Sequence, residues 1–154
     1  MSNVEKITAA IFKYSFDIPI NRPSTEVWPL LFSHINDWWM NDYRALGADS
    51  EMSFKPEVGA SMIEKGKNGE ALEWYRIQMI VPGQSVYLVG FLAADWGGPA
   101  TTMLKLALND TESGCTLSVS DALQGDVSTS VAGGTQDGWR EIFDDGFRQF
   151  VEAR

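Results

Sequence analysis

The sequence predicts an α+β fold in which one curved antiparallel sheet of about six or seven strands surrounds a long C-terminal helix. Three observations predict it. One segment near the start alternates between apolar and polar residues, a series of alternating segments separated by turn residues follows two short helical patterns, and the chain closes on an amphipathic helix. A lone apolar helix must bury its stripe against the concave face of such a sheet. At this length we expect a single domain over residues 1–154.

The first strand is expected at residues 11–20, with the sequence IFKYSFDIPI. Lys13, Ser15 and Asp17 alternate there with larger apolar side chains. A period of two residues is typical of a strand with one buried face. The apolar side is predicted to consist of Phe12, Tyr14, Phe16, Ile18 and Ile20.

Two short helices are expected after this strand. Residues 22–32, RPSTEVWPLLF, offer Ser24 as an N-cap and Glu26 in the first turn, where the helix dipole favours a carboxylate. Pro29 is awkward in a helix interior because it removes a backbone donor. Residues 35–45, INDWWMNDYRA, form a second short pattern that gathers three of its aromatic side chains and an isoleucine.

The middle of the chain predicts successive antiparallel hairpins. Residues 60–66 and 70–81 flank a turn that is rich in glycine and asparagine, and a Pro-Gly pair then leads into residues 85–93. Residues 101–110 and 115–123 form the last hairpin, joined by the turn sequence TESG.

The long helix is expected to begin between Ser128 and Gln136 and to end near Glu152. Its closing stretch, GWREIFDDGFRQFVEAR, spaces apolar residues at helical intervals. The stripe consists of Trp139, Ile142, Phe143, Phe147, Phe150 and Val151. Gly146 lies on the same face, so we expect the helix and the sheet to approach closest there.

Charge and cysteine content exclude several partners. Twelve Lys and Arg against 21 Asp and Glu leave a formal charge of −9, which repels nucleic acid and anionic membrane surfaces. Cys115 is the only cysteine, and no secretion signal opens the chain, so a cytoplasmic location is expected. No apolar stretch approaches the roughly 20 residues of a membrane span.

A cavity is expected at one end of the long helix. A twisted sheet cannot contact a straight helix along its whole length, so one end packs and the other leaves a gap. Residues 130–138, SVAGGTQDG, are small enough to leave space rather than fill it. The predicted ligand-binding residues are Tyr14, Trp39, Met62, Tyr75, Leu88, Asp121, Ala132, Thr135, Trp139 and Phe143.

Asp121 is the strongest candidate for a polar contact to a ligand. It alternates with Leu117 and Val119, so its side chain points inward unless a bulge intervenes. A buried carboxylate is costly unless it is hydrogen-bonded. A carboxylate at a strand end near solvent is an equally good interpretation of the same residue.

Other chemical groups carry less weight. His34 is the only histidine, and we interpret it as a surface or helix-capping residue. Glu64, Glu70 and Glu73 lie around one hairpin, where two lysines among them favour a solvated tip over a pair for acid–base work. We therefore expect no catalytic nucleophile, no metal site and no cofactor.

A succession of motifs carries a family resemblance. They are RPSTEVWPLLF at 22–32, the pair Trp38 and Trp39, PEVGASM at 56–62, VPGQSVYLVG at 81–90, SGCTLSVSDAL at 113–123 and GWREIFDDGFRQFVE at 138–152. In this order they resemble the START, polyketide-cyclase and birch-pollen-allergen superfamily (SRPBCC). The most similar branch is that of the heat-shock-protein-ATPase-activator homologues, which is common in bacteria.

The resemblance implies the helix-grip fold and a hydrophobic cavity between helix and sheet. Relatives often carry a large aromatic residue at Gly90, so the glycine either enlarges the cavity or marks a bulge. They often place a histidine or another polar residue where Asp121 stands. Known roles in the superfamily range from lipid carriage to aromatic cyclisation and co-chaperone work.

Two functions from different classes follow, with a third behind them. We prefer a module that carries or sequesters a small hydrophobic or aromatic molecule. The alternative is a cyclase or dehydratase acting on a polyketide-like substrate, with Asp121 or Tyr14 transferring protons. Chaperone regulation ranks third, because the eukaryotic activator carries an additional domain. The sequence leaves a homodimer open.

Overall fold

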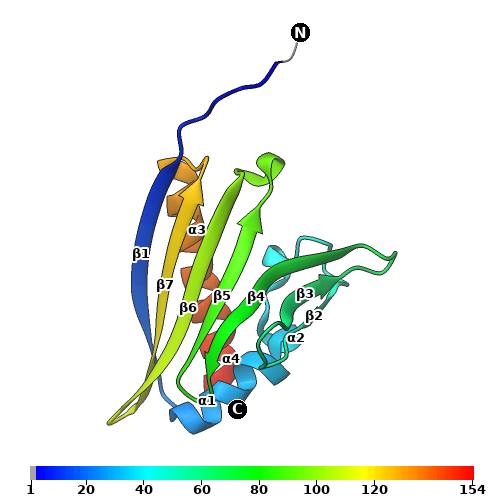
Figure 1. The fold of residues 1–154 in the computed structure, drawn as a ribbon. Coiled ribbons are helices and arrows are strands. Elements are labelled where there is room, and N and C mark those ends of the chain that lie inside the picture. Colours follow the sequence, from blue (N-terminus) through cyan, green and yellow to red (C-terminus); the bar gives the residue numbers. More distant parts are fainter. Residues whose placement is uncertain (1–2) are drawn as a thin grey trace.

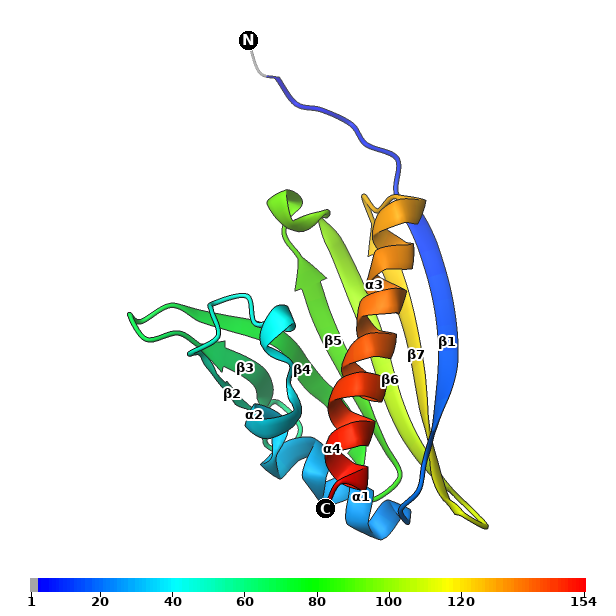
Figure 2. The same cartoon turned by 180° about the vertical axis from the view of Figure 1, so that it is seen from behind.

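The computed structural model describes residues 3–154 and has the expected helix-grip α+β fold (Figure 1). Seven antiparallel strands form one sheet in the order β1-β7-β6-β5-β4-β3-β2. The strands are β1 (Ala10–Ile20), β2 (Glu51–Ser53), β3 (Ser61–Lys65), β4 (Ala71–Val81), β5 (Ser85–Leu92), β6 (Ala100–Thr111) and β7 (Gly114–Gly125). The long C-terminal helix crosses the concave face of this sheet (Figure 2).

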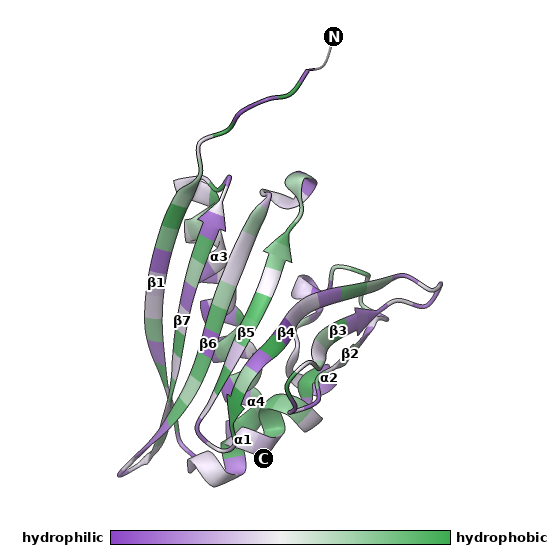
Figure 3. Ribbon diagram, viewed as in Figure 1, coloured by the Kyte–Doolittle hydropathy of each residue, from purple (hydrophilic) through white to green (hydrophobic). Residues whose placement is uncertain are grey.

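Alternation of side chains sets the two faces of the sheet, as the sequence predicts. Along β1, Phe16, Ile18 and Ile20 are buried and the residues between them are exposed. Strand β1 pairs with β7 without a register shift, from Ala10 opposite Gly125 to its last residue opposite Cys115. Hydrophobic and hydrophilic bands accordingly alternate along both strands (Figure 3). One face of the sheet therefore supplies the core.

Two bulges bend β4. Met62 on β3 lies opposite Tyr75, but the next residue lies opposite Glu73, so Trp74 is the extra residue. A second register shift lies between Ile77 and Met79. Bulges kink a strand and increase its twist. The sheet therefore curves at β4, which carries the β2–β3 hairpin out of the plane of the other strands (Figure 1).

The long helix consists of α3 (Thr129–Glu141), a π-helical segment (Ile142–Arg148) and α4 (Gln149–Glu152). Its ends agree with the prediction. Ser128 is the N-cap, because its Oγ accepts a hydrogen bond of 3.1 Å from the Val131 N–H. The π-helical segment was not predicted. None of the helices within residues 3–154 is long and apolar enough to cross a membrane.

Gly146 lies where the long helix approaches another element most closely, but that element is not the sheet. A Cβ atom at Gly146 would lie 2.8 Å from the carbonyl oxygen of Trp38 and 3.1 Å from Met40 Cγ. The sequence correctly predicted a tight contact here and was wrong about its partner. The contact is with the chain that leaves α2 (Ile35–Trp38).

The helix α1 (Ser24–Ser33) begins differently from the prediction. Ser24 is its first helical residue, and Pro23 holds the N-cap position without a side-chain bond. The backbone N–H of Ser24 donates instead to Asp110 Oδ1 at 3.0 Å, from the end of β6. A carboxylate brought by the sheet thus satisfies a free N–H group of this helix.

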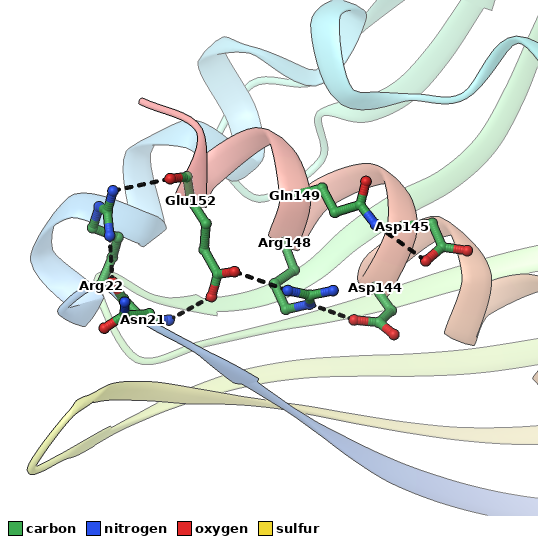
Figure 4. A network of polar contacts seen from close by, with 7 residues as sticks. All are labelled: Asn21, Arg22, Asp144, Asp145, Arg148, Gln149 and Glu152. Carbon is green, nitrogen blue, oxygen red and sulfur yellow. Dashed lines mark hydrogen bonds and ion pairs between the residues drawn. The ribbon is translucent and has the colours of Figure 1, made fainter.

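Polar contacts fix the C-terminal end of the long helix to the end of β1 (Figure 4). The Asn21 N–H donates to Glu152 Oε2 at 2.7 Å, and Arg22 donates to the Glu152 carbonyl oxygen at 3.0 Å. Arg148 pairs with both Asp144 and Glu152 along the helix. The packed end of the helix is thereby fixed in position.

We expect Gly146→Leu to lower the free energy of unfolding by about 1 to 3 kcal/mol, because the side chain would be forced against Trp38 and Met40. Gly133→Leu is the matched control, since a Cβ atom there would meet nothing within 4 Å. The control should gain up to about 1 kcal/mol from helix propensity. Urea unfolding measures both. An equal gain at the two glycines would contradict the close approach.

Candidate ligand-binding cavity

A cavity of about 710 Å³ lies between α3 and the bent part of the sheet. Cavities of this size hold small organic ligands. The helix contributes Val131, Gly134, Thr135, Gly138, Trp139 and Ile142 to its wall. A Cβ atom at Gly134 would meet nothing within 4 Å, so this glycine leaves the space open. The cavity thus lies at the small-residue end of the helix, as the sequence predicts.

Packed aromatic rings form the inner wall. Trp139 stacks on Phe143, with ring centroids 5.3 Å apart and planes 19° apart, and lies 5.7 Å from Tyr75. Behind it, Trp39 lies 5.9 Å from Trp139 and 5.3 Å from Trp74. Mutual packing of this kind holds aromatic side chains in fixed orientations. The wall is therefore a preformed apolar surface.

Hydroxyl groups form a polar floor. Tyr75 and Thr102 both line the cavity, and their side-chain oxygens are 3.0 Å apart. Thr102 Oγ1 donates to Asp121 Oδ1 at 2.6 Å, and the Tyr14 hydroxyl donates to Asp121 Oδ2 at 2.6 Å. Asp121 is buried, with 4% of its surface exposed. It therefore reaches the cavity only through other side chains.

Burial has the largest effect on the pKa of Asp121. It raises the pKa of Asp121 above its ordinary value, although the hydrogen bonds from Thr102 and Tyr14 act to lower it. Burial likewise raises the pKa of Tyr75, and the nearby Asp121 charge adds to the rise. The phenol groups are therefore neutral hydrogen-bonding partners at neutral pH.

Gly90 leaves space for the Tyr75 ring at the cavity floor. A Cβ atom there would lie 2.9 Å from the Tyr75 ring and 2.7 Å from the Trp74 carbonyl oxygen. Gly90 pairs with Thr102 in an unbroken β5–β6 register, so it marks no bulge between these strands. The space that this glycine frees is occupied by Tyr75 instead of adding to the cavity.

Glu64 organises one rim. Its side chain is fully buried and accepts four hydrogen bonds, from the backbone N–H groups of Ala45 and Leu46, from Ser50 Oγ and from Trp74 Nε1. Burial alone would raise the pKa of Glu64, but these hydrogen bonds outweigh it and lower the pKa. The interpretation of Glu64 as part of a solvated hairpin tip is therefore wrong. Its carboxylate holds three cavity-lining residues in place, namely Ala45, Leu46 and Trp74.

Two further contacts hold the same rim. Arg44 donates to the carbonyl oxygens of Asn36 and Ser50, each at 2.7 Å, and of Trp39 at 3.1 Å. The Tyr43 hydroxyl donates to Glu141 Oε2 at 2.7 Å, which raises the pKa of Tyr43 to about 12. The rim is thus tied to α3 across the cavity.

The predicted ligand-binding residues fall into three groups. Tyr75, Thr135 and Trp139 line the cavity. Trp39, Met62, Leu88 and Phe143 lie in the core behind it, and at most 2% of any of these side chains is exposed. The rest are Ala132, in a small buried cluster with Ala100, Leu123 and Val127, and the pair Tyr14 and Asp121 behind the floor.

Sequence analysis missed several residues of the wall. Thr102 alternates with Leu104 and Leu106, so the signal that placed Asp121 inward was available for it too. Trp74 reaches the wall at a bulge, which local alternation does not reveal. Trp96, more than half exposed, comes from a turn between β5 and β6 for which no structure was predicted.

The cavity is nearly free of charge. Glu73 is its only charged lining residue within residues 3–154, and it pairs with Arg76 at 3.0 Å. The hydrogen bond from Ser61 is the main cause that lowers the pKa of Glu73. No lysine, arginine or histidine of the described chain lines the wall. An anionic ligand would find no opposite charge there.

No model of a known protein family and no curated protein sequence matches the chain. Solved structures do. Protein MLL2253 from Mesorhizobium loti is 20% identical over 92% of this chain and 98% of its own, with a TM-score of 0.69. An AHSA1-like protein from Aeromonas hydrophila is 18% identical over 92% and 93% of the two chains, with a TM-score of 0.62.

DynU16, a protein of the dynemicin biosynthetic locus, is 15% identical over 92% of this chain and 46% of its own, with a TM-score of 0.62. At these identities the likenesses show the fold alone.

We expect Glu64→Gln to lower the free energy of unfolding by about 2 to 4 kcal/mol at neutral pH, because an amide cannot accept all four hydrogen bonds. Glu70→Gln, on the exposed tip of the same hairpin, is the control and should change little. Urea unfolding of both variants measures the difference.

The loss should also depend on pH. The folded pKa of Glu64 is lowered, so its stabilisation is present above the unfolded pKa of about 4.3 and disappears as the pH falls through the folded value. Wild type and Glu64→Gln should therefore converge in acid. A difference that is constant with pH would contradict a stabilising carboxylate.

Proposed function

We propose that the chain binds a small uncharged hydrophobic or aromatic molecule between α3 and the sheet, as a carrier or sequestering protein. The cavity of about 710 Å³ with an aromatic wall carries this proposal. Apolar walls supply affinity, and a few fixed polar groups orient the ligand. The hydroxyl groups at Tyr75 and Thr102 meet the second requirement.

The charge of the wall favours neutral ligands over anionic ones. A carboxylate that leaves water needs a cationic or hydrogen-bonding partner. The wall offers the Glu73 carboxylate, and the buried Asp121 lies behind the floor. Fatty alcohols and uncharged aromatic compounds therefore fit this site better than fatty acids.

A cyclase or dehydratase is the second candidate. The hydrogen-bonded series from Asp121 through Thr102 to Tyr75 supports it, because such a series can pass a proton between a buried acid and a bound substrate. The fold likeness to DynU16, from a biosynthetic locus, is in keeping with this role. Binding requires fewer assumptions and comes first. Chaperone regulation rests on the likeness to the AHSA1-like protein and ranks third.

We expect Gly134→Leu to weaken binding of the neutral dye N-phenyl-1-naphthylamine by about tenfold or more, because the new side chain occupies the cavity. Gly133→Leu adds the same side chain to the same helix, at a position outside the lining, and should bind as the wild type does. Dye fluorescence gives the affinities. Equal binding by both variants, or no binding by the wild type, would refute the proposed site.

A matched pair of ligands tests the charge argument. We expect 1-dodecanol to bind more tightly than dodecanoate at about pH 8, where the acid is ionised, because the wall offers no cation. Displacement of N-phenyl-1-naphthylamine measures both below their micelle concentrations. Tighter binding of dodecanoate would overturn the preference for uncharged ligands.

A further inference from the structure

When Asp121 is ionised, counting hydrogens fixes the direction of each hydrogen bond at the cavity floor. An ionised carboxylate only accepts, and each hydroxyl group carries a single hydrogen. Thr102 gives its hydrogen to Asp121, so in the 3.0 Å contact between Thr102 and Tyr75 it is Tyr75 that donates. Tyr14 gives its hydrogen to the other carboxylate oxygen. All three hydroxyl hydrogens are therefore committed within the protein.

A ligand in the cavity therefore meets a hydrogen-bond acceptor, the Tyr75 oxygen. With its hydrogen directed at Thr102 and one lone pair accepting from the Trp139 indole N–H, Tyr75 can offer a ligand only the remaining lone pair of its oxygen. A ligand group that carries its own hydrogen, such as a hydroxyl or an amino group, completes this arrangement. A carbonyl or ether oxygen would be left facing another oxygen, which costs the hydrogen bond it made with water.

Protonation of Asp121 reverses the direction of the hydrogen bonds through Thr102 to Tyr75. When Asp121 is protonated on Oδ1, it donates to Thr102, Thr102 then donates to Tyr75, and the Tyr75 hydrogen becomes free to point at the ligand. Tyr14 keeps its bond to Oδ2 throughout. Only hydroxyl hydrogens move, and no covalent bond between heavy atoms changes.

Hydroxyl groups contact Asp121, and Lys13 of β1 lines a second pocket together with it without pairing with it. Tyr14 from β1 and Thr102 from β6 contact it directly, and Tyr75 from β4 stands behind Thr102, with Trp139 of α3 packed on its ring. Within residues 3–154, no cationic side chain forms an ion pair or a hydrogen bond with Asp121. Burial raises the pKa of the Asp121 carboxyl group, and the hydrogen bonds from Thr102 and Tyr14 act against this rise.

We propose that the cavity selects ligands by a hydroxyl or amino group that donates a hydrogen bond to Tyr75, and that protonation of Asp121 converts Tyr75 from acceptor to donor. This rests on the proposed function, since it requires a ligand in the cavity. It adds a class of ligands, namely apolar alcohols, phenols and neutral amines. It also adds a switch, because protonation of Asp121 changes which ligands are preferred.

Two naphthalenes with the same ring system test whether the ligand donates a hydrogen bond to Tyr75. By titration calorimetry at about pH 8, wild type should bind 2-naphthol about 2- to 10-fold more tightly than 2-methoxynaphthalene, the value of one hydrogen bond. Tyr75→Phe removes the acceptor, so the ratio of the two affinities should fall several-fold. Tyr87→Phe makes the same change on β5 outside the cavity lining and should keep the wild-type ratio.

Asp121→Asn tests whether protonation of Asp121 converts Tyr75 from acceptor to donor. The amide can donate to Thr102 while accepting from Tyr14, which fixes the series in the direction of the protonated acid. This variant should bind 2-acetylnaphthalene, a pure acceptor, about 2- to 10-fold more tightly relative to 2-naphthol than wild type does. Adding Thr102→Val interrupts the series and should abolish that gain.

Each outcome has a separate meaning. If none of the three naphthalenes binds wild type, the cavity proposal fails and this inference falls with it. If they bind but Tyr75→Phe keeps the wild-type ratio, or Asp121→Asn leaves the preference for 2-acetylnaphthalene unchanged, the donor selectivity is wrong and the cavity stands. Should Tyr75→Phe fail to fold, the Asp121→Asn comparison decides alone.

Discussion

The mismatch between a nearly straight helix and a bent sheet is the constraint on which the rest of the structure depends. Two bulges curve β4, so the long helix can follow the sheet along only part of its length. At the C-terminal end, Phe147 and Val151 pack into the core and Glu152 is bonded to the end of β1. The opposite half carries glycines in place of large side chains. The space therefore opens at one end only, and the fixed end prevents the helix from sliding to close it.

Two charged groups stiffen the rim without pairing with each other. Glu64 accepts hydrogen bonds from backbone N–H groups of the loop after Tyr43, and Arg44 donates hydrogen bonds to carbonyl oxygens of the same region. An irregular loop next to a cavity lacks ladder hydrogen bonds, so its backbone groups need other partners. The Glu64 carboxylate accepts from backbone N–H groups, and the Arg44 guanidinium donates to backbone carbonyl oxygens. Both kinds of backbone group therefore have partners. The loop keeps its shape whether or not a ligand is present, as a preformed site requires.

The sequence predicted what depends on periodicity and missed what depends on tertiary structure. A period of two residues placed the strands and turned Asp121 inward, and small residues located the roomy end of the helix. Met62 and Glu64 alternate in the same way, yet neighbouring lysines favoured a solvated tip for Glu64. Its partners come from a loop distant in sequence, which no local pattern reveals. The bulge at Trp74 has no local signature either.

The two buried carboxylates show how a structural group can be told from a functional one. Glu64 is satisfied by two backbone N–H groups, which exist whatever the neighbouring side chains are, so the fold depends on it. Asp121 is satisfied by the hydroxyl groups of Tyr14 and Thr102. An apolar residue at position 121 would continue the pattern of Leu117 and Val119, and replacing all partners of a buried hydrogen bond by apolar groups can be nearly neutral or stabilising. The position of Asp121 beneath the Tyr75 and Thr102 hydroxyl groups at the cavity floor points to the ligand.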